Sequence, residues 1–153
     1  MAYLVDTNII VRGSDPGDPN YHLAKYAVEM LRLAGQSLCL SRQNLIEYRN
    51  VATRPIDKNG LGMSVTEADK ELTRLESVFI TLPDNDFIYA KWRTLVTAKA
   101  VSGRQVHDAR LVAVMLTYGI THILTFNDLD FVRFVSLPHE LGEGVIAVHP
   151  LRA

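Results

Sequence analysis

The sequence of 153 residues contains a single cysteine, Cys39, and this scarcity of thiols excludes several kinds of protein. One cysteine cannot form a disulfide within the chain. Without a group of cysteines and histidines there is also no pattern typical of a zinc site. We therefore expect Cys39 to be a buried structural thiol and the protein to be cytoplasmic, in a reducing compartment.

Long apolar runs and a large net charge are also missing. No apolar stretch approaches the roughly 18 residues that a membrane-spanning helix needs, and the N-terminus lacks the basic segment of a signal peptide. The 16 Lys and Arg stand against 17 Asp and Glu, which gives a formal net charge of −1. We therefore expect no membrane association, and any contact with nucleic acid must use a local basic patch.

Short apolar stretches alternate with longer amphipathic segments along the chain. The apolar stretches predict strands at 2–5, 37–40, 78–82, 121–126 and 145–148. The amphipathic segments predict helices at 21–35, 41–54, 85–100 and 104–119, and a capping box at 64–67 opens one more. Strands that alternate with helices favour a mostly parallel sheet covered on both faces. Residues 1–153 are thus predicted to form one α/β domain with four to five strands.

Asp6, in the stretch "YLVDTNII", is a carboxylate at the end of the first predicted strand. Burying an unpaired charge costs several kcal/mol or more, so such a group is normally paired, protonated or bound to a metal. A second interpretation is that Asp6 caps a short helix that begins in "DTNII".

Asp108 opens the helix predicted at 104–119, and it shares a helix face with three apolar residues, Leu111, Val112 and Met115. An acidic residue in a first turn can simply favour the positive end of the helix. That role does not require the side chain to face the core, whereas a site at the sheet edge does. His107 and Arg110 are predicted to point elsewhere.

Further oxygen ligands follow other strands. "TFNDLDF" carries Asn127, Asp128 and Asp130 after the fourth strand, and Glu47 lies within the helix after the second. In parallel sheets ligands bind outside the carboxyl ends of the strands, so these groups converge on Asp6 if the strands are neighbours. A solvated position is the alternative for Glu47. Converging carboxylates without cysteine favour Mg²⁺ or Mn²⁺ and metal-assisted phosphoryl transfer.

Four segments, "YLVDTNII", "NLIEYRNV", "GRQVHDARLVAVM" and "ILTFNDLDF", resemble in their order and spacing the PIN-domain ribonucleases. The likeness is closest to the VapC-like toxins of type II toxin–antitoxin systems and covers nearly the whole chain. It implies a three-layer α/β/α PIN-like fold and a Mg²⁺- or Mn²⁺-dependent endoribonuclease that hydrolyses RNA phosphodiester bonds. It also implies a homodimer and a small cognate antitoxin that covers the site.

The resemblance further implies roles for individual residues. Asp6, Glu47 and Asp108 match acidic positions of the family and would bind the metal and carry catalysis. For the fourth position Asp130 ranks first, followed by Asn127, which stands where many members have Asp, and then by Asp128. A supporting hydrogen bond to Asp6 is expected from Thr7 or Asn8, and Thr125 is expected to orient the last carboxylate of the site. Candidates for contacts with RNA phosphates are Arg12, Arg42, Arg49, Arg54 and Arg104.

Two other functions remain open at this point. The first is a catalytically weak PIN fold that serves for binding or dimerisation, which the amide at Asn127 favours. The second is a phosphatase with Asp6 as nucleophile. That chemistry usually needs an acidic residue two positions later, where this sequence has Asn8. The phosphatase is therefore the less favoured of the two.

Overall fold

Five short strands form a parallel sheet in the order β3-β2-β1-β4-β5 in the computed structural model, which describes residues 1–153. The strands are β1 (Ala2–Val5), β2 (Ser37–Ser41), β3 (Ile80–Leu82), β4 (His122–Leu124) and β5 (Ile146–Val148). The predicted α/β fold with a mostly parallel sheet is confirmed, and every strand pair is in fact parallel. Three strands, β3, β4 and β5, are shorter than predicted, because Val78 still belongs to a helix, Thr125 has already left the sheet and Val145 has not yet entered it.

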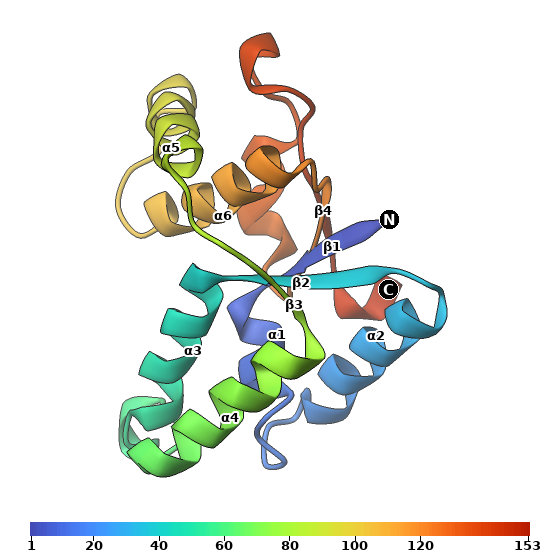
Figure 1. Ribbon diagram of the computed structural model, residues 1–153, viewed down its shortest axis with the longest axis vertical. Helices are drawn as coiled ribbons and strands as arrows, with labels where there is room; N and C mark the ends of the chain where they lie inside the picture. Colours follow the sequence, from blue (N-terminus) through green and yellow to red (C-terminus); the bar gives the residue numbers. More distant parts are fainter.

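Six α-helices cover the two faces of the sheet, which gives the predicted three layers. They are α1 (Thr7–Arg12), α2 (Tyr21–Leu33), α3 (Arg42–Thr53), α4 (Val65–Val78), α5 (Asp86–Ala98) and α6 (Gln105–Tyr118). Figure 1 shows α5 and α6 on one face and α1 to α4 on the other. None of these helices has both the length and the apolar character needed to cross a membrane.

The central strand β1 is buried on both of its faces. Leu4 belongs to the apolar core on the side of α5 and α6, whereas Tyr3 and Val5 belong to the core on the side of α1 to α4. This two-sided burial explains why the strand reads as a continuous apolar run rather than an alternating one. Each buried side chain of this size contributes about 1.5–3 kcal/mol, so the position of Asp6, directly after β1, is firmly anchored.

Residues Asp128–Phe134 form a 3₁₀ helix, η2, where the sequence analysis predicts no element. Phe131 and Phe134 are buried in the core beside α6 and fix this segment. Three shorter 3₁₀ helices are η1 (Ile56–Lys58), η3 (His139–Leu141) and η4 (Pro150–Arg152). The burial of the two phenylalanines fixes the rotation of η2 and with it the positions of Asp128 and Asp130.

Gly144 lies so close to the end of η2 that the position has no room for a side chain. A Cβ atom there would stand 1.7 Å from the carbonyl oxygen of Val135, and the next residue, Val145, donates its N–H to the Phe134 oxygen at 2.9 Å. We expect Gly144→Ala to lower the free energy of unfolding by about 1–3 kcal/mol, because the backbone must shift to relieve the overlap.

Urea denaturation measures this effect, and Gly17→Ala is the matched control. At Gly17 the nearest atom to an added Cβ is a side-chain oxygen of Asp15 at 3.4 Å, an ordinary contact. Equal stability of the two variants would contradict the close approach of Gly144 to η2.

Candidate functional site

Asp6 and Thr125 meet at the carboxyl ends of two neighbouring strands. β1 pairs with β4 so that Val5 lies opposite Leu124, and each strand is followed directly by one of the two polar residues. The Thr125 hydroxyl donates a hydrogen bond of 2.8 Å to Oδ2 of Asp6. The predicted convergence of these two strand ends is therefore confirmed.

The Asp6 side chain is buried, with 8% of the residue exposed, and it has several neutral donors around it. Oδ1 accepts the N–H of Thr7 at 2.7 Å, so Asp6 caps α1 as one of the two interpretations predicted. The Asn8 amide donates to Thr125 Oγ1 at 3.2 Å and to Asp6 Oδ2 at 3.4 Å. Thr7 and Asn8 thus support Asp6 as predicted, whereas Thr125 orients Asp6 rather than the last carboxylate of the site. Burial nevertheless outweighs these bonds and raises the pKa of Asp6.

Asn44 belongs to the same network and was missed by the sequence analysis. It is completely buried, and its Nδ2 donates to the Thr7 hydroxyl at 3.0 Å. Its Oδ1 accepts from the backbone N–H and the hydroxyl of Ser41 at 2.9 and 2.7 Å. The capping pattern "SRQN" signals the local bonds to Ser41. The contact with Thr7, which ties α3 to α1, has no local signal.

Four carboxylates lie close enough to change one another's ionisation. The pKa of Asp108 is raised to about 7, mainly by burial and then by the negative charges of Asp6, Asp130 and Glu47. Asp130 also raises the pKa of Asp6. Burial raises the pKa of Glu47, and the charge of Asp6 adds to that effect. The structure therefore brings together the four acidic residues ranked first in the sequence analysis.

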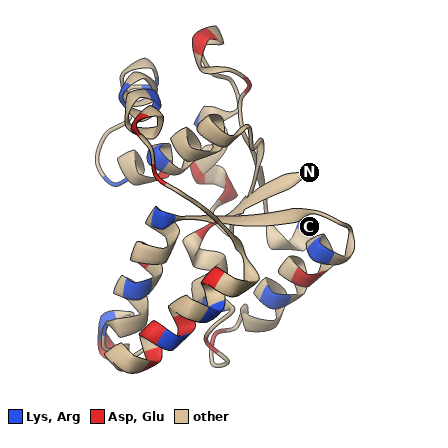
Figure 2. Ribbon diagram, in the orientation of Figure 1, with Lys and Arg blue, Asp and Glu red and all other residues tan.

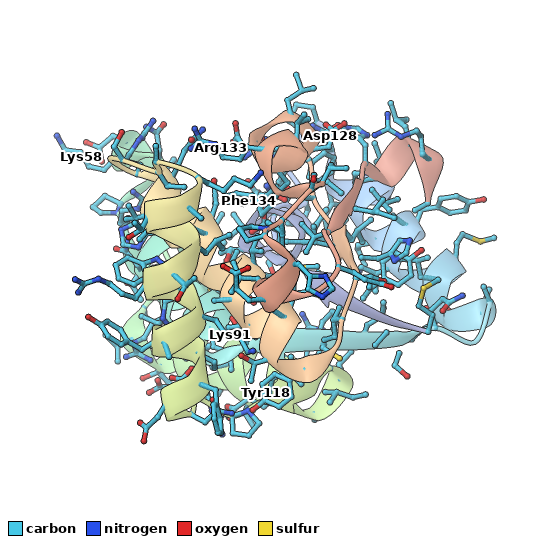
Figure 3. All side chains as sticks on the ribbon, turned by 90° about the horizontal axis from the view of Figure 1, so that it is seen from above. Lys58, Lys91, Tyr118, Asp128, Arg133 and Phe134 are labelled. Carbon is cyan, nitrogen blue, oxygen red and sulfur yellow. The ribbon has the colours of Figure 1, made fainter.

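The other two candidates in the "NDLD" segment are placed differently. Asp128 forms an ion pair of 2.8 Å with Arg152, and this hydrogen bond lowers the pKa of its carboxyl. Figure 3 shows Asp128 and Arg133 on opposite sides of η2. Asn127 contacts the network through its backbone, which donates to Thr125 Oγ1 at 3.0 Å. Of the three residues, Asp130 is the one whose charge acts on the other carboxylates.

None of the arginines selected from the sequence contacts the carboxylates. Arg12 stacks on the ring of Phe126 at 4.4 Å from its centre, and Arg49 pairs with Asp69. The remaining three, Arg42, Arg54 and Arg104, form none of the ion pairs in the structure. Figure 2 shows basic residues spread over several helices, with both signs intermixed along α4, rather than gathered in one basic surface.

Arg110 and His107, which the helix pattern predicts to point away from the face of Asp108, still act on the site through their charges. The charges of both residues lower the pKa of Glu47. Glu47 lies on α3, a different helix. The side of α6 that acts on Glu47 cannot be identified from the spacing of apolar residues along α6 alone.

The donor atoms of this cluster fit a hard divalent cation. All are carboxylate oxygens, and Oε1 of Glu47 is buried without any hydrogen-bond partner. An orphaned carboxylate oxygen of this kind is unfavourable unless a cation or a proton satisfies it. As the side chains stand, no group of three or more His, Cys, Asp or Glu is close enough to hold one metal ion. The carboxylates that act on one another, and that would have to supply such a site, are Asp6, Glu47, Asp108 and Asp130.

Comparison with known proteins identifies the family. The model of the PIN domain matches residues 3–135, which is most of the chain. No curated protein matches the sequence.

Solved structures share the fold at low sequence identity. VapBC-1 from nontypeable Haemophilus influenzae has a TM-score of 0.65 at 19% identity and covers 99% of each chain. VapBC2 from Rickettsia felis, solved with a DNA fragment from its promoter, has a TM-score of 0.65 at 16% sequence identity. The alignment covers 97% of this chain and 98% of the VapBC2 chain. VapC20 from Mycobacterium tuberculosis, a toxin that cleaves the sarcin-ricin loop, has a TM-score of 0.57 at 21% sequence identity. The alignment covers 80% of this chain and 87% of the VapC20 chain. Identities this low show a common fold alone.

Replacing Thr125 by valine tests the hydrogen-bond network around Asp6. The hydroxyl donates to Asp6 and accepts from Asn8 and Asn127, so its loss removes three hydrogen bonds at a buried position. We expect Thr125→Val to lower the free energy of unfolding by about 1–3 kcal/mol in urea. The control is Thr94→Val, because that hydroxyl is exposed on α5 and bonds only to its own helix. An equal, small loss in both proteins would argue against the network.

The raised pKa of Asp108 predicts how the stability of the metal-free protein depends on pH. Below about pH 4 the residue is protonated in the folded and the unfolded chain alike. Between the unperturbed value of 3.8 and about 7, the unfolded chain has lost this proton while the folded protein retains it. The free energy of unfolding therefore falls as pH rises through this window and levels off above it.

Asp108→Asn should reduce the amount by which the free energy of unfolding falls as pH rises. Between pH 5 and pH 8 the difference is about 3 kcal/mol for a fully buried group and about half of that here, because solvent screens a partly exposed carboxylate. Urea titrations at pH 5 and pH 8 in a chelator measure it, with the exposed Asp57→Asn as control. Parallel pH profiles for wild type and Asp108→Asn would disprove the assigned ionisation.

Proposed function

The chain belongs to the PIN-domain family, and on that premise we propose that it is a Mg²⁺- or Mn²⁺-dependent endoribonuclease. PIN-domain proteins are generally nucleases, and those nucleases typically use divalent metals. The family membership sets the reaction class, and the carboxylates of this chain supply the argument for where the reaction takes place.

The observation that carries the proposal is the mutual effect of the four carboxylates. The charges of Asp6, Glu47 and Asp130 all raise the pKa of Asp108, so the ionised cluster repels itself. A divalent cation at its centre would remove this repulsion and satisfy the orphaned oxygen of Glu47. Exclusively oxygen donors favour Mg²⁺ or Mn²⁺ over zinc or copper.

In this proposal each residue has a defined task. Asp6 and Asp108 hold the ion, Glu47 binds it directly or through water, and Asp130 completes the site through water. Thr125 and Asn8 orient the Asp6 carboxylate by the hydrogen bonds described above. The ion, when bound, supplies an activated water and neutralises charge on the phosphoryl oxygens during phosphodiester hydrolysis.

The proposed biological setting is a toxin–antitoxin pair, with residues 1–153 forming a single PIN domain. Two of the structural neighbours are VapBC proteins, and a third is a toxin that cleaves an RNA loop. We propose RNA as the substrate, a homodimer as the assembly and a small antitoxin as the partner. Among the arginines, Arg12 is the one whose neighbours adjoin the acidic network, since Phe126 donates its N–H to Asn8 at 3.2 Å.

Cleavage of RNA by the purified protein tests this function. With Mg²⁺ or Mn²⁺ we expect endonucleolytic products, and chelation of the metal should abolish them. Asp6→Ala and Asp108→Ala should each lower the rate by at least about a hundredfold, because charge stabilisation by the ion is lost. Asp57→Ala, which removes an exposed acidic residue of η1, is the matched control.

Two results would point to the other functions. If wild type, Asp6→Ala and Asp108→Ala bind Mn²⁺ equally weakly and leave RNA intact, the chain is a PIN fold used for binding. A phosphorylated enzyme that forms in wild type and is lost in Asp6→Asn would instead indicate an aspartyl phosphatase.

A further inference from the structure

The first turn of α6, which carries Asp108, is held from two sides by side chains of other helices. The indole N–H of Trp92 on α5 donates to the carbonyl oxygen of Val106 at 2.8 Å. The amide of Gln43 on α3 donates to the carbonyl oxygen of His107, also at 2.8 Å. These two carbonyls directly precede Asp108, and each has a second lone pair for such a contact.

A third contact reaches the same turn from η2. Arg133 donates from Nη1 to Oε1 of Gln105 at 2.7 Å. Figure 3 shows Arg133 on the side of η2 away from Asp128. Arg104, at the N-cap position of α6, makes no capping hydrogen bond with its side chain. Contacts from neighbouring elements thus hold a helix start that lacks the usual side-chain cap.

Gln43 also links α6 to Glu47. Its Oε1 accepts from Nη1 of Arg110 at 3.1 Å, and its side chain lowers the pKa of Glu47 by hydrogen bonding. Arg110 in turn donates from Nη2 to Asp84 at 3.2 Å. One amide therefore contacts the first turn of α6, a cation of the same helix and an acidic residue of α3. Gln43 is therefore a direct link between the helix that carries Glu47 and the turn that carries Asp108.

These contacts oppose a specific force. Asp108 stands among three like charges, and repulsion tends to move an uncapped first turn away from the cluster. We propose that Gln43 and Trp92 are positioning residues that hold Asp108 close to the other carboxylates before any metal binds. The inference rests on the proposed metal-dependent function, because it concerns the affinity of that same site for its ion.

Two conservative variants remove the hydrogen bonds and keep the packing. Trp92→Phe retains an aromatic ring against Val106 but loses the N–H, and Gln43→Met has a similar length without the amide. The control for the first is Tyr89→Phe, one turn away on α5, where the ring packs against Trp92 at 5.7 Å. For the second it is Asn50→Leu, at an exposed position of α3.

The measurement is the dissociation constant of Mn²⁺ alone, by calorimetry on the full chain, together with the cleavage rate at saturating Mn²⁺. We expect each variant to weaken Mn²⁺ binding by about 3–10-fold, the effect of losing one hydrogen bond that preorganises a ligand. The rate at saturating Mn²⁺ should stay within about twofold, since the bound ion restores the arrangement. Both controls should bind Mn²⁺ as wild type does.

A merely structural role of Gln43 and Trp92 predicts a different result. Replacing either residue would then lower the free energy of unfolding but leave the Mn²⁺ affinity of the folded protein unchanged. Wild-type affinity in Gln43→Met and Trp92→Phe, with binding lost in Asp108→Asn, would overturn the positioning role alone. Absence of Mn²⁺ binding in wild type itself would overturn the metal site and the positioning role with it.

Discussion

The burial of the Asp6 carboxylate at the end of the central strand is the constraint on which the arrangement of the site depends. The donors that compensate for this burial come from two parts of the fold, the start of α1 and the end of β4. The N–H of Thr7 starts α1, the Thr125 hydroxyl ends β4, and the Asn8 amide bridges the two. These donors meet only because β1 and β4 are neighbours in register, so sheet order and the chemistry of the site are determined together.

The support around Asp6 is electrically neutral, and this has a chemical consequence. Hydroxyl, amide and backbone donors orient a carboxylate without cancelling its charge, whereas an arginine would both orient and neutralise it. Arg110 and His107 only partly offset the burial that raises the pKa of Glu47, and no basic residue is among the groups that act on Asp6 or Asp108. The compensation that these carboxylates lack is one that a divalent cation can supply.

Much of this architecture could be predicted from local sequence. Apolar runs located the strands, the capping boxes at Ser41 and Ser64 located two helix starts, and the strand ends located Asp6 and Thr125. The roles of Asn44, Gln43 and Arg110 could not be predicted in the same way. Their bonds join different helices, and the face that a residue presents to another helix depends on packing that one helix pattern does not contain.

The choice between Asp128 and Asp130 shows the same limit within one segment. The two residues are two positions apart, and nothing in "NDLD" itself decides which one acts on Asp6. Burial of Phe131 and Phe134 fixes the rotation of η2, and Arg152, from the C-terminal turn, pairs with the half-buried Asp128, whereas Asp130 stays exposed. Only Asp130 then adds its charge to that of Asp6 and Asp108. The segment thus contributes one negative charge to the cluster rather than two, which limits the repulsion that the protein must withstand when no cation is bound.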